Sequence, residues 1–224
     1  MIYKAVLLDF DGTLADSMPC WLDLPRRTLE EAGIPEPPEF RRIIREIPMR
    51  EVAVWMAAEY PELVRERTLE ERWYAMMEDN YLRRVSLKPG AEALLALLRS
   101  LWLRPAILSA TKRPLLDTAL GRFGLFSRVD LVLTEEEAGS KRTEAPYRLA
   151  AERLGADLAE MVLVEDAPRN LAAARALGLG TVGVYDESMA PFRAELLAAS
   201  DLALPDLSDL APLRAFLEKG PVSR

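Results

Sequence analysis

The chain contains the stretch Lys4-Ala5-Val6-Leu7-Leu8-Asp9-Phe10-Asp11-Gly12-Thr13-Leu14, in which a short apolar run meets two aspartates. A short apolar run closed by turn-forming residues is typical of a buried strand. Burying one carboxylate costs free energy, and holding two close together costs more unless a cation offsets their charge. Gly12 allows a sharp turn, and Thr13 adds a hydroxyl beside it. The stretch therefore predicts a strand that ends in a catalytic loop, rather than an ordinary Asp-Gly turn.

From residue 89 onward, short apolar runs alternate with segments of helical spacing. We expect strands over residues 105–108, 129–133, 161–164, 181–184 and 201–204, after a first strand that ends at Asp9. We expect helices over residues 89–101, 114–123, 145–154, 169–177, 190–199 and 210–218. Strands that alternate with helices in this way indicate βαβ units. The sequence therefore predicts an α/β fold with a mostly parallel sheet.

Residues 16–86 carry helical patterns and no strand-like run. Helices are expected over residues 21–32, 39–47, 51–60 and 63–84, with prolines between them. Trp21, Trp55 and Trp73 fall in this block, and aromatic residues at helical spacing usually pack in a core. We therefore expect two domains: an α/β core formed by residues 1–15 and 87–224, and an inserted all-helical domain formed by residues 16–86.

The chain has 224 residues, a net charge of −7 and no histidine. It is long enough to bury a sizeable core. Because no basic tract stands out, we expect neither nucleic acid nor an anionic membrane as a partner. The absence of histidine excludes Ser-His-Asp triads, histidine-ligated zinc and histidine general bases. Acid-base chemistry is left to carboxylates, lysine, tyrosine or cysteine.

The single cysteine, Cys20, excludes an internal disulfide and fits a reducing cytosol. The sequence has no run of about 18 apolar residues, so we expect no segment that spans a membrane. Lys4 and Asp9 interrupt the first apolar run, which argues against a cleavable signal. We therefore expect a cytoplasmic protein, and the sequence leaves open whether it is a monomer or a dimer.

Polar side chains follow three of the expected strands. The first strand ends at Asp9, the second at Ser109, and the strand that begins at Met161 ends at Glu165 and Asp166. In parallel sheets of this kind, ligands bind at the carboxyl ends of the strands. We therefore expect these acids and this hydroxyl to converge on one site.

Phosphoryl transfer is the chemistry that these residues suit. Asp9, at the strand end, is the candidate nucleophile that would form an aspartyl-phosphate. Asp11, two residues later, is the candidate general acid and base. Two carboxylates beside a substrate phosphate repel one another, so we expect a Mg²⁺ ion, which prefers oxygen ligands. Asp9, Asp11 and Asp166 are its candidate ligands, with Glu165 as a further ligand or an outer partner.

The remaining phosphate charge needs hydrogen-bond donors. The candidates are the hydroxyl of Ser109, backbone N–H groups near Ala110, and a lysine. Thr13 is a further candidate because its hydroxyl lies in the turn that follows the two aspartates.

The string Asp-Phe-Asp-Gly-Thr resembles the first motif of the haloacid dehalogenase-like hydrolases, most of which are phosphatases. Ile107-Leu108-Ser109 resembles the second motif, and Lys141, followed by Tyr147, the third. Residues 162–170, with the acidic pair Glu165-Asp166, resemble the fourth. The sequence departs from the family at Arg142, Ala167 and Ala110, where Pro, Ser and Asn are frequent.

The resemblance implies a Rossmann-like core with a helical cap over residues 16–86, in the branch of phosphoglycolate phosphatase and β-phosphoglucomutase. It implies Lys141 as the phosphate-binding lysine, for which Lys112 is a rival beside Ser109. The dehalogenases of the family lack the second aspartate, here Asp11, so dehalogenation is not expected. We expect a Mg²⁺-dependent phosphatase that acts on a small phosphorylated metabolite, with phosphoglycolate, sugar phosphates and nucleoside monophosphates as equal guesses.

Three other functions are alternatives. A sugar phosphomutase would use the same core, but the resembled mutases use a cap histidine that this chain lacks. A regulatory protein would bind phosphate without turnover, which the intact acids argue against. A receiver-like signalling domain also uses acids, a hydroxyl and a lysine, but the helical insert and the chain length argue against it.

Two further acidic segments are not assigned to the site. Glu135-Glu136-Glu137 is expected to be a solvated face. Val184-Tyr185-Asp186-Glu187 follows a strand, and its position near the site is the less favoured interpretation.

Overall fold

The computed structural model describes residues 2–64 and 67–221, which divide into two compact units. The first unit contains the described residues up to Asp16 and from Leu87 onward, and the second contains Ser17–Ser86. This division differs by one residue from the boundary expected from the sequence, because Asp16 belongs to the first unit.

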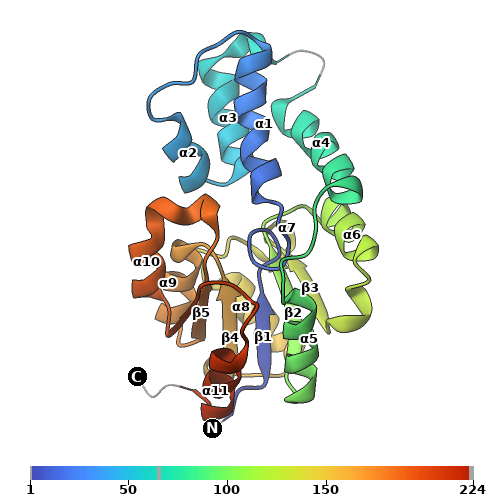
Figure 1. Ribbon diagram of the computed structural model, residues 1–224, viewed down its shortest axis with the longest axis vertical. Coiled ribbons are helices and arrows are strands. Elements are labelled where there is room, and N and C mark those ends of the chain that lie inside the picture. Colours follow the sequence, from blue (N-terminus) through green and yellow to red (C-terminus); the bar gives the residue numbers. More distant parts are fainter. Residues whose placement is uncertain (1, 65–66, 222–224) are drawn as a thin grey trace. The chain divides into compact units, whose positions relative to one another are not determined.

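The first unit is built on a six-stranded sheet in the order β3-β2-β1-β4-β5-β6 (Figure 1). The strands are β1 (Ala5–Leu8), β2 (Arg104–Ser109), β3 (Leu131–Thr134), β4 (Met161–Glu165), β5 (Gly180–Val184) and β6 (Leu202–Leu204). Every neighbouring pair in the sheet is parallel. The predicted α/β fold with a parallel sheet is therefore confirmed, and β1 lies inside the sheet, as its fully buried apolar run requires.

Helices cover both faces of this sheet, as parallel strands require. They are α5 (Ala91–Ser100), α6 (Arg113–Arg122), α7 (Glu135–Ala138), α8 (Ala145–Leu154), α9 (Pro168–Ala176), α10 (Arg193–Ala199) and α11 (Ala211–Lys219). Figure 1 shows α5 and α11 in front of the sheet and α8 and α9 behind it. Leu7, Leu108 and Leu163 pack into a core with Tyr147 of α8 and Leu171 of α9.

Two helices begin three or more residues later than the sequence predicted. The segment 187–199 begins as a 3₁₀ helix, Glu187–Phe192, that contains Pro191, and α10 begins only at Arg193. In the second unit, α4 begins at Leu69 rather than at residue 63, because Thr68 and Glu71 form a capping box there. Residues 65–66 of the expected range lie outside the described residues.

The second unit is helical in all its regular elements among residues 17–64 and 67–86. Its helices are α1 (Met18–Glu31), α2 (Phe40–Glu46), α3 (Met49–Glu59) and α4 (Leu69–Arg83), with a 3₁₀ turn at Pro61–Leu63. Trp21 and Trp73 are buried as predicted, whereas Trp55 is only half-buried, with its ring 6.1 Å from that of Phe40. The Trp73 indole N–H donates to Thr28 Oγ1 at 2.9 Å, so this large side chain is buried with its polar atom satisfied.

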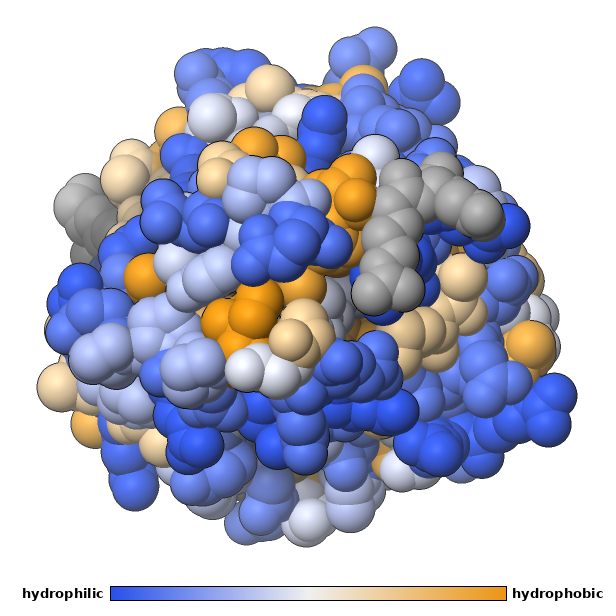
Figure 2. Space-filling model, turned by 90° about the horizontal axis from the view of Figure 1, so that it is seen from above, coloured by the Kyte–Doolittle hydropathy of each residue, from blue (hydrophilic) through white to orange (hydrophobic). Residues whose placement is uncertain are grey.

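None of the helices among the described residues combines the length and apolar character that crossing a bilayer requires. On the face that Figure 2 presents, apolar residues form small groups among polar ones.

The register of the sheet brings the carboxyl ends of three strands to the same level. Leu8 of β1 pairs with Ile107 of β2 and with Val164 of β4. Asp9, one residue beyond Leu8, therefore lies level with Leu108 and Glu165. The polar residues that follow these strands share one edge of the sheet.

Substitution of Gly90 tests this architecture. Gly90 immediately precedes α5 with φ at +89°, and a Cβ there would lie 1.8 Å from the Leu207 carbonyl oxygen. We expect Gly90→Ala to lower the free energy of unfolding by about 3 kcal/mol, from backbone strain and steric overlap. The matched control is Gly155→Ala, with φ at +61° and no atom within 4 Å of the added Cβ, which should cost about 1 kcal/mol. Denaturant unfolding measures both, and equal losses would contradict the contact with Leu207.

Candidate active site

Three buried carboxylates meet at the carboxyl edge of the sheet. Asp9, Glu165 and Asp166 each place a carboxylate oxygen within 4.8 Å of the others. Their side chains are almost inaccessible, with exposed fractions of 4%, 1% and 4%. Among the described residues this group therefore offers an all-oxygen set that could hold a metal ion, and the donor chemistry is that of a hard cation such as Mg²⁺.

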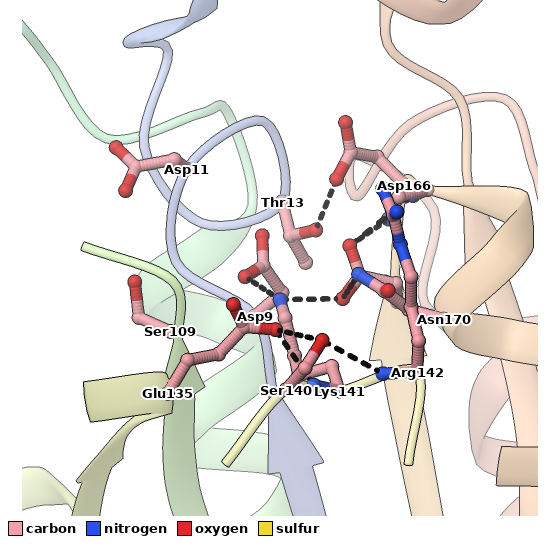
Figure 3. A network of polar contacts seen from close by, with 12 residues as sticks. Asp9, Asp11, Thr13, Ser109, Glu135, Ser140, Lys141, Arg142, Asp166 and Asn170 are labelled. Atoms are coloured by element: carbon pink, nitrogen blue, oxygen red, sulfur yellow. Dashed lines mark hydrogen bonds and ion pairs between the residues drawn. The ribbon is translucent and has the colours of Figure 1, made fainter. Parts of the chain in front are cut away.

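Lys141 supplies the positive charge inside this group. Its Nζ lies 2.5 Å from Asp9 Oδ1 and 2.7 Å from Glu165 Oε2, and only 3% of the side chain is exposed (Figure 3). The backbone of Lys141 is also fixed, because its N–H donates to Glu135 Oε1 at 2.6 Å and its carbonyl accepts from the Tyr147 hydroxyl at 2.6 Å. The backbone of Lys141 is therefore fixed through both its N–H and its carbonyl group.

Glu165 has both carboxylate oxygens engaged by the protein. Its Oε1 accepts from the backbone N–H groups of Asp166 and Ala167, at 3.2 and 3.1 Å. Its Oε2 accepts from Lys141 and from the Asn170 amide at 3.1 Å. This arrangement suits Glu165 as an orienting partner of the lysine and the loop, rather than as a group left open for a ligand.

The electrostatics of the cluster are unbalanced. Burial, and then the charge of Glu165, raise the pKa of Asp9 from 3.8 to about 8, against the opposing effect of Lys141. Burial, and then the charges of Glu165 and Asp9, raise the pKa of Asp166 well above its usual range. Burial also opposes the charge on Glu165, but the charge of Lys141 and the hydrogen bonds that Glu165 accepts together outweigh burial, so the pKa of Glu165 is lowered.

The pKa of Lys141 itself lies well above its usual value, because the charges of Asp9 and Glu165 outweigh the effect of burial. One ammonium thus faces three carboxylates, two of which resist ionisation. A divalent cation between Asp9 and Asp166 would offset this excess of negative charge, so the residues present fit such an ion.

Asp11 lies apart from the three carboxylates. Its Oδ2 accepts from Thr111 Oγ1 at 2.7 Å, and Figure 3 shows its carboxylate directed away from Asp9 and Asp166. From the sequence we expected Asp11 among the metal ligands, but the structure does not bring its carboxylate into that group. Thr111 was not singled out from the sequence, although a hydroxyl two residues after Ser109 is a visible signal.

The expected phosphate donors flank the carboxylates. Ser109 is buried at the end of β2, where its Oγ accepts from the Thr111 N–H at 3.0 Å. Thr13 is fully buried, and its hydroxyl points to Asp166 Oδ1 at 3.5 Å (Figure 3). Ala110 is exposed directly after β2, so its backbone follows the same strand end.

The expectation for residues 135–137 was wrong for Glu135. Thr134 and Glu137 form a capping box that begins α7, and Glu135 accepts from Ser140 as well as from Lys141. The spacing Thr-x-x-Glu could have predicted this short helix. Lys112, the rival of Lys141, immediately precedes α6, whereas Lys141 reaches Asp9 and Glu165 directly.

Comparison with known proteins agrees with this arrangement. Residues 3–178 match the family model described as haloacid dehalogenase-like hydrolase, and the chain belongs to this family. It is 34% identical to the plasmid phosphoglycolate phosphatase of Cupriavidus necator over 190 residues, which cover 78% of each chain. It is 30% identical to the phosphoglycolate phosphatase of Neisseria meningitidis over 197 residues, covering 81% of this chain and 80% of that one.

A solved structure shares the fold: CbbY from Rhodobacter sphaeroides, in complex with phosphate, superimposes with a TM-score of 0.75. The match covers 94% of this chain and 97% of that one at 21% identity. The family and the phosphatase relatives together identify the chain as a phosphatase of the haloacid dehalogenase-like family, which confirms the resemblance inferred from the motifs.

Lys141→Met tests the central ion pairs. It leaves Asp9 and Glu165 buried without their ammonium, so we expect the free energy of unfolding to fall by about 3 kcal/mol or more and phosphatase activity to be lost. Lys112→Met is the matched control and should change stability by less than about 0.5 kcal/mol. Denaturant unfolding and phosphate release measure the two effects, and a larger loss for Lys112→Met would reverse the assignment of the two lysines.

Proposed function

We propose that this phosphatase hydrolyses a small phosphorylated metabolite with Mg²⁺, through an aspartyl-phosphate formed on Asp9. The observation that carries the proposal is the position of Asp9 directly after β1. One of its carboxylate oxygens contacts the Lys141 ammonium, and the carboxylate of Asp166 lies nearby. A carboxylate fixed in this way is oriented before substrate arrives, which is the condition for nucleophilic catalysis.

Asp9 and Asp166 are the residues that we assign to the metal. Their side chains do not have the four hydrogen bonds that occupy Glu165, so their oxygens are the better ligands. Bound there, Mg²⁺ would offset the carboxylate charge and polarise an oxygen of the substrate phosphate. We assign no metal-binding role to the Asp11 carboxylate.

The reaction follows in two steps. The Asp9 carboxylate attacks phosphorus, the bond from phosphorus to the leaving oxygen breaks, and Asp11 gives that oxygen a proton. Asp11 then takes a proton from the water that attacks the aspartyl-phosphate, which releases phosphate and restores the Asp9 carboxylate. The side chain of Asp11 turns away from Thr111 to do this, since the hydrogen bond to Thr111 directs it away from Asp9.

The phosphate oxygens need donors while this happens. We assign them the hydroxyls of Ser109 and Thr13, the backbone N–H groups near Ala110, and the ammonium of Lys141. The buried position of Ser109, Thr13 and Lys141 supports this assignment, because hydrogen bonds to charge are stronger where water is excluded.

Phosphoglycolate is the first substrate to test, because both relatives described above are named phosphoglycolate phosphatases. We propose that Ser17–Ser86 acts as a cap that selects the substrate. In support, this unit begins at Ser17, four residues after Thr13, so the chain enters it directly from the loop that carries Asp9 and Asp11.

Substitution of the two aspartates separates their roles. Asp9→Asn removes the nucleophile and should reduce phosphate release from an aryl phosphate by at least about a thousandfold. Asp11→Asn should lower kcat by about a hundredfold or more while KM changes much less, because the proton is needed only in the transition state. The exposed Asp206→Asn serves as the control and should leave turnover unchanged. Retained turnover in Asp9→Asn would refute its role.

Mg²⁺ binding should release protons. Burial raises the pKa of Asp9 to about 8, so a proton and a cation compete for this carboxylate near neutral pH. We therefore expect Mg²⁺ affinity to rise with pH between about 6 and 8, because the pKa values of both Asp9 and Asp166 are raised. Calorimetry at pH 7 in two buffers of different ionisation enthalpy measures the proton release, with Asp166→Asn as the variant that weakens binding. Affinity that does not change between pH 6 and 8 would contradict the assignment.

A further inference from the structure

A second ion pair, largely shielded from solvent, lies in the first unit, outside the cluster described above. Lys88 Nζ is 2.5 Å from Asp186 Oδ2, and the two side chains are 14% and 8% exposed. A desolvated pair of this kind is screened less by salt than a surface pair, so its charges act on their surroundings.

The Lys88 end of this pair is fixed to the catalytic loop. The backbone N–H of Lys88 donates to the Leu14 carbonyl at 2.8 Å, and the preceding residue, Leu87, forms an antiparallel bridge with Ala15. Lys88 is therefore attached to the loop that begins at Asp9, although the two segments are distant in sequence.

The Asp186 end is fixed to the loop after β5. Asp186 Oδ1 accepts from the Ser188 N–H at 2.9 Å. This hydrogen bond caps the start of the 3₁₀ helix Glu187–Phe192. Both oxygens of Asp186 thus have a defined partner, one charged and one neutral.

The pair joins two loops on either side of the strand that carries Asp166. In the sheet, β4 lies between β1 and β5, and Glu165 pairs with Gly183. Lys88 is attached to the loop after β1, and Asp186 lies in the loop after β5. The ion pair thus links these loops next to the end of β4. In agreement, the charge of Asp186 is among the causes that raise the pKa of Asp166.

We propose that Lys88 and Asp186 form a positioning pair that sets the Mg²⁺ affinity of the site by keeping the charge beside Asp166 close to zero. The inference rests on the proposed function, since it requires a cation at Asp9 and Asp166. Asp186 alone would strengthen cation binding, and Lys88 alone would oppose it. Paired at 2.5 Å, their charges largely cancel at Asp166, and the link also fixes the loops after β1 and β5.

The test is Mg²⁺ binding measured by calorimetry on the full chain. Lys88→Met leaves the charge of Asp186 uncompensated and should tighten Mg²⁺ binding, whereas Asp186→Asn leaves the ammonium and should weaken it. We expect changes of about three- to tenfold in opposite directions. The double variant Lys88→Met with Asp186→Asn should return to within about twofold of the original affinity, and Lys88→Arg, which keeps the charge, should leave it unchanged.

The control pair is Lys4 and Glu160, 2.8 Å apart before β1 and β4, at the opposite edge of the sheet. Lys4→Met and Glu160→Gln should leave Mg²⁺ affinity unchanged. Shifts of the same sign in both Lys88→Met and Asp186→Asn, or no shift in either, would overturn the proposal, because a purely structural pair changes stability without opposite effects on the cation. If Lys88→Met does not fold, the weakening in Asp186→Asn and its reversal in the double variant decide the question.

Failure of this inference is distinguishable from failure of the proposed function. If the unmodified chain binds no Mg²⁺, the proposed function fails. If it binds Mg²⁺ and Asp166→Asn weakens that binding while the paired variants behave alike, only the role of Lys88 and Asp186 fails.

Discussion

The ion pairs of Lys141 are the interactions on which the rest of the site depends. Without this ammonium, Asp9 and Glu165 would be buried acids with only neutral donors around them. The protein therefore fixes Lys141 through its side chain, its N–H and its carbonyl, with partners from β4, α7, α8 and the residue that follows β1. Elements distant in sequence are thus tied to one point at the end of the parallel sheet.

A histidine-free chain must carry out its proton transfers with other groups. Here the environment separates acids of the same chemical type into different roles. Glu165 is held ionised by Lys141, Asp9 and Asp166 are pushed toward protonation by burial, and Asp11 is hydrogen-bonded to a hydroxyl at a distance from them. The division of labour that we propose follows from these surroundings rather than from residue type.

The sheet and the positions of Asp9, Ser109 and Glu165 were predictable because each depends on a local pattern, an apolar run closed by a polar residue. The contact of Thr111 with Asp11 was not, because it joins segments that only the folded chain brings together. Glu135 and Asn170 contact residues five or six positions away, but these contacts depend on the exact path of a loop or a helix start, which an apolar pattern does not specify. The Lys88–Asp186 pair spans 98 residues of sequence, and no local pattern in either segment indicates it. The carboxylate of Asp11 was misplaced for a related reason: nearness in sequence to Asp9 does not fix where a side chain in a turn points.

The bridge between Ala15 and Leu87 has a consequence for the architecture. The chain leaves the first unit and returns to it at adjacent points, so two neighbouring chain segments connect the inserted unit to the first unit. We therefore expect a change of length within the inserted segment to leave the strands in place, since the bridge already closes the gap in the main fold. If the inserted unit selects the substrate, as we propose, its residues can change without altering the strands that carry Asp9 and Glu165.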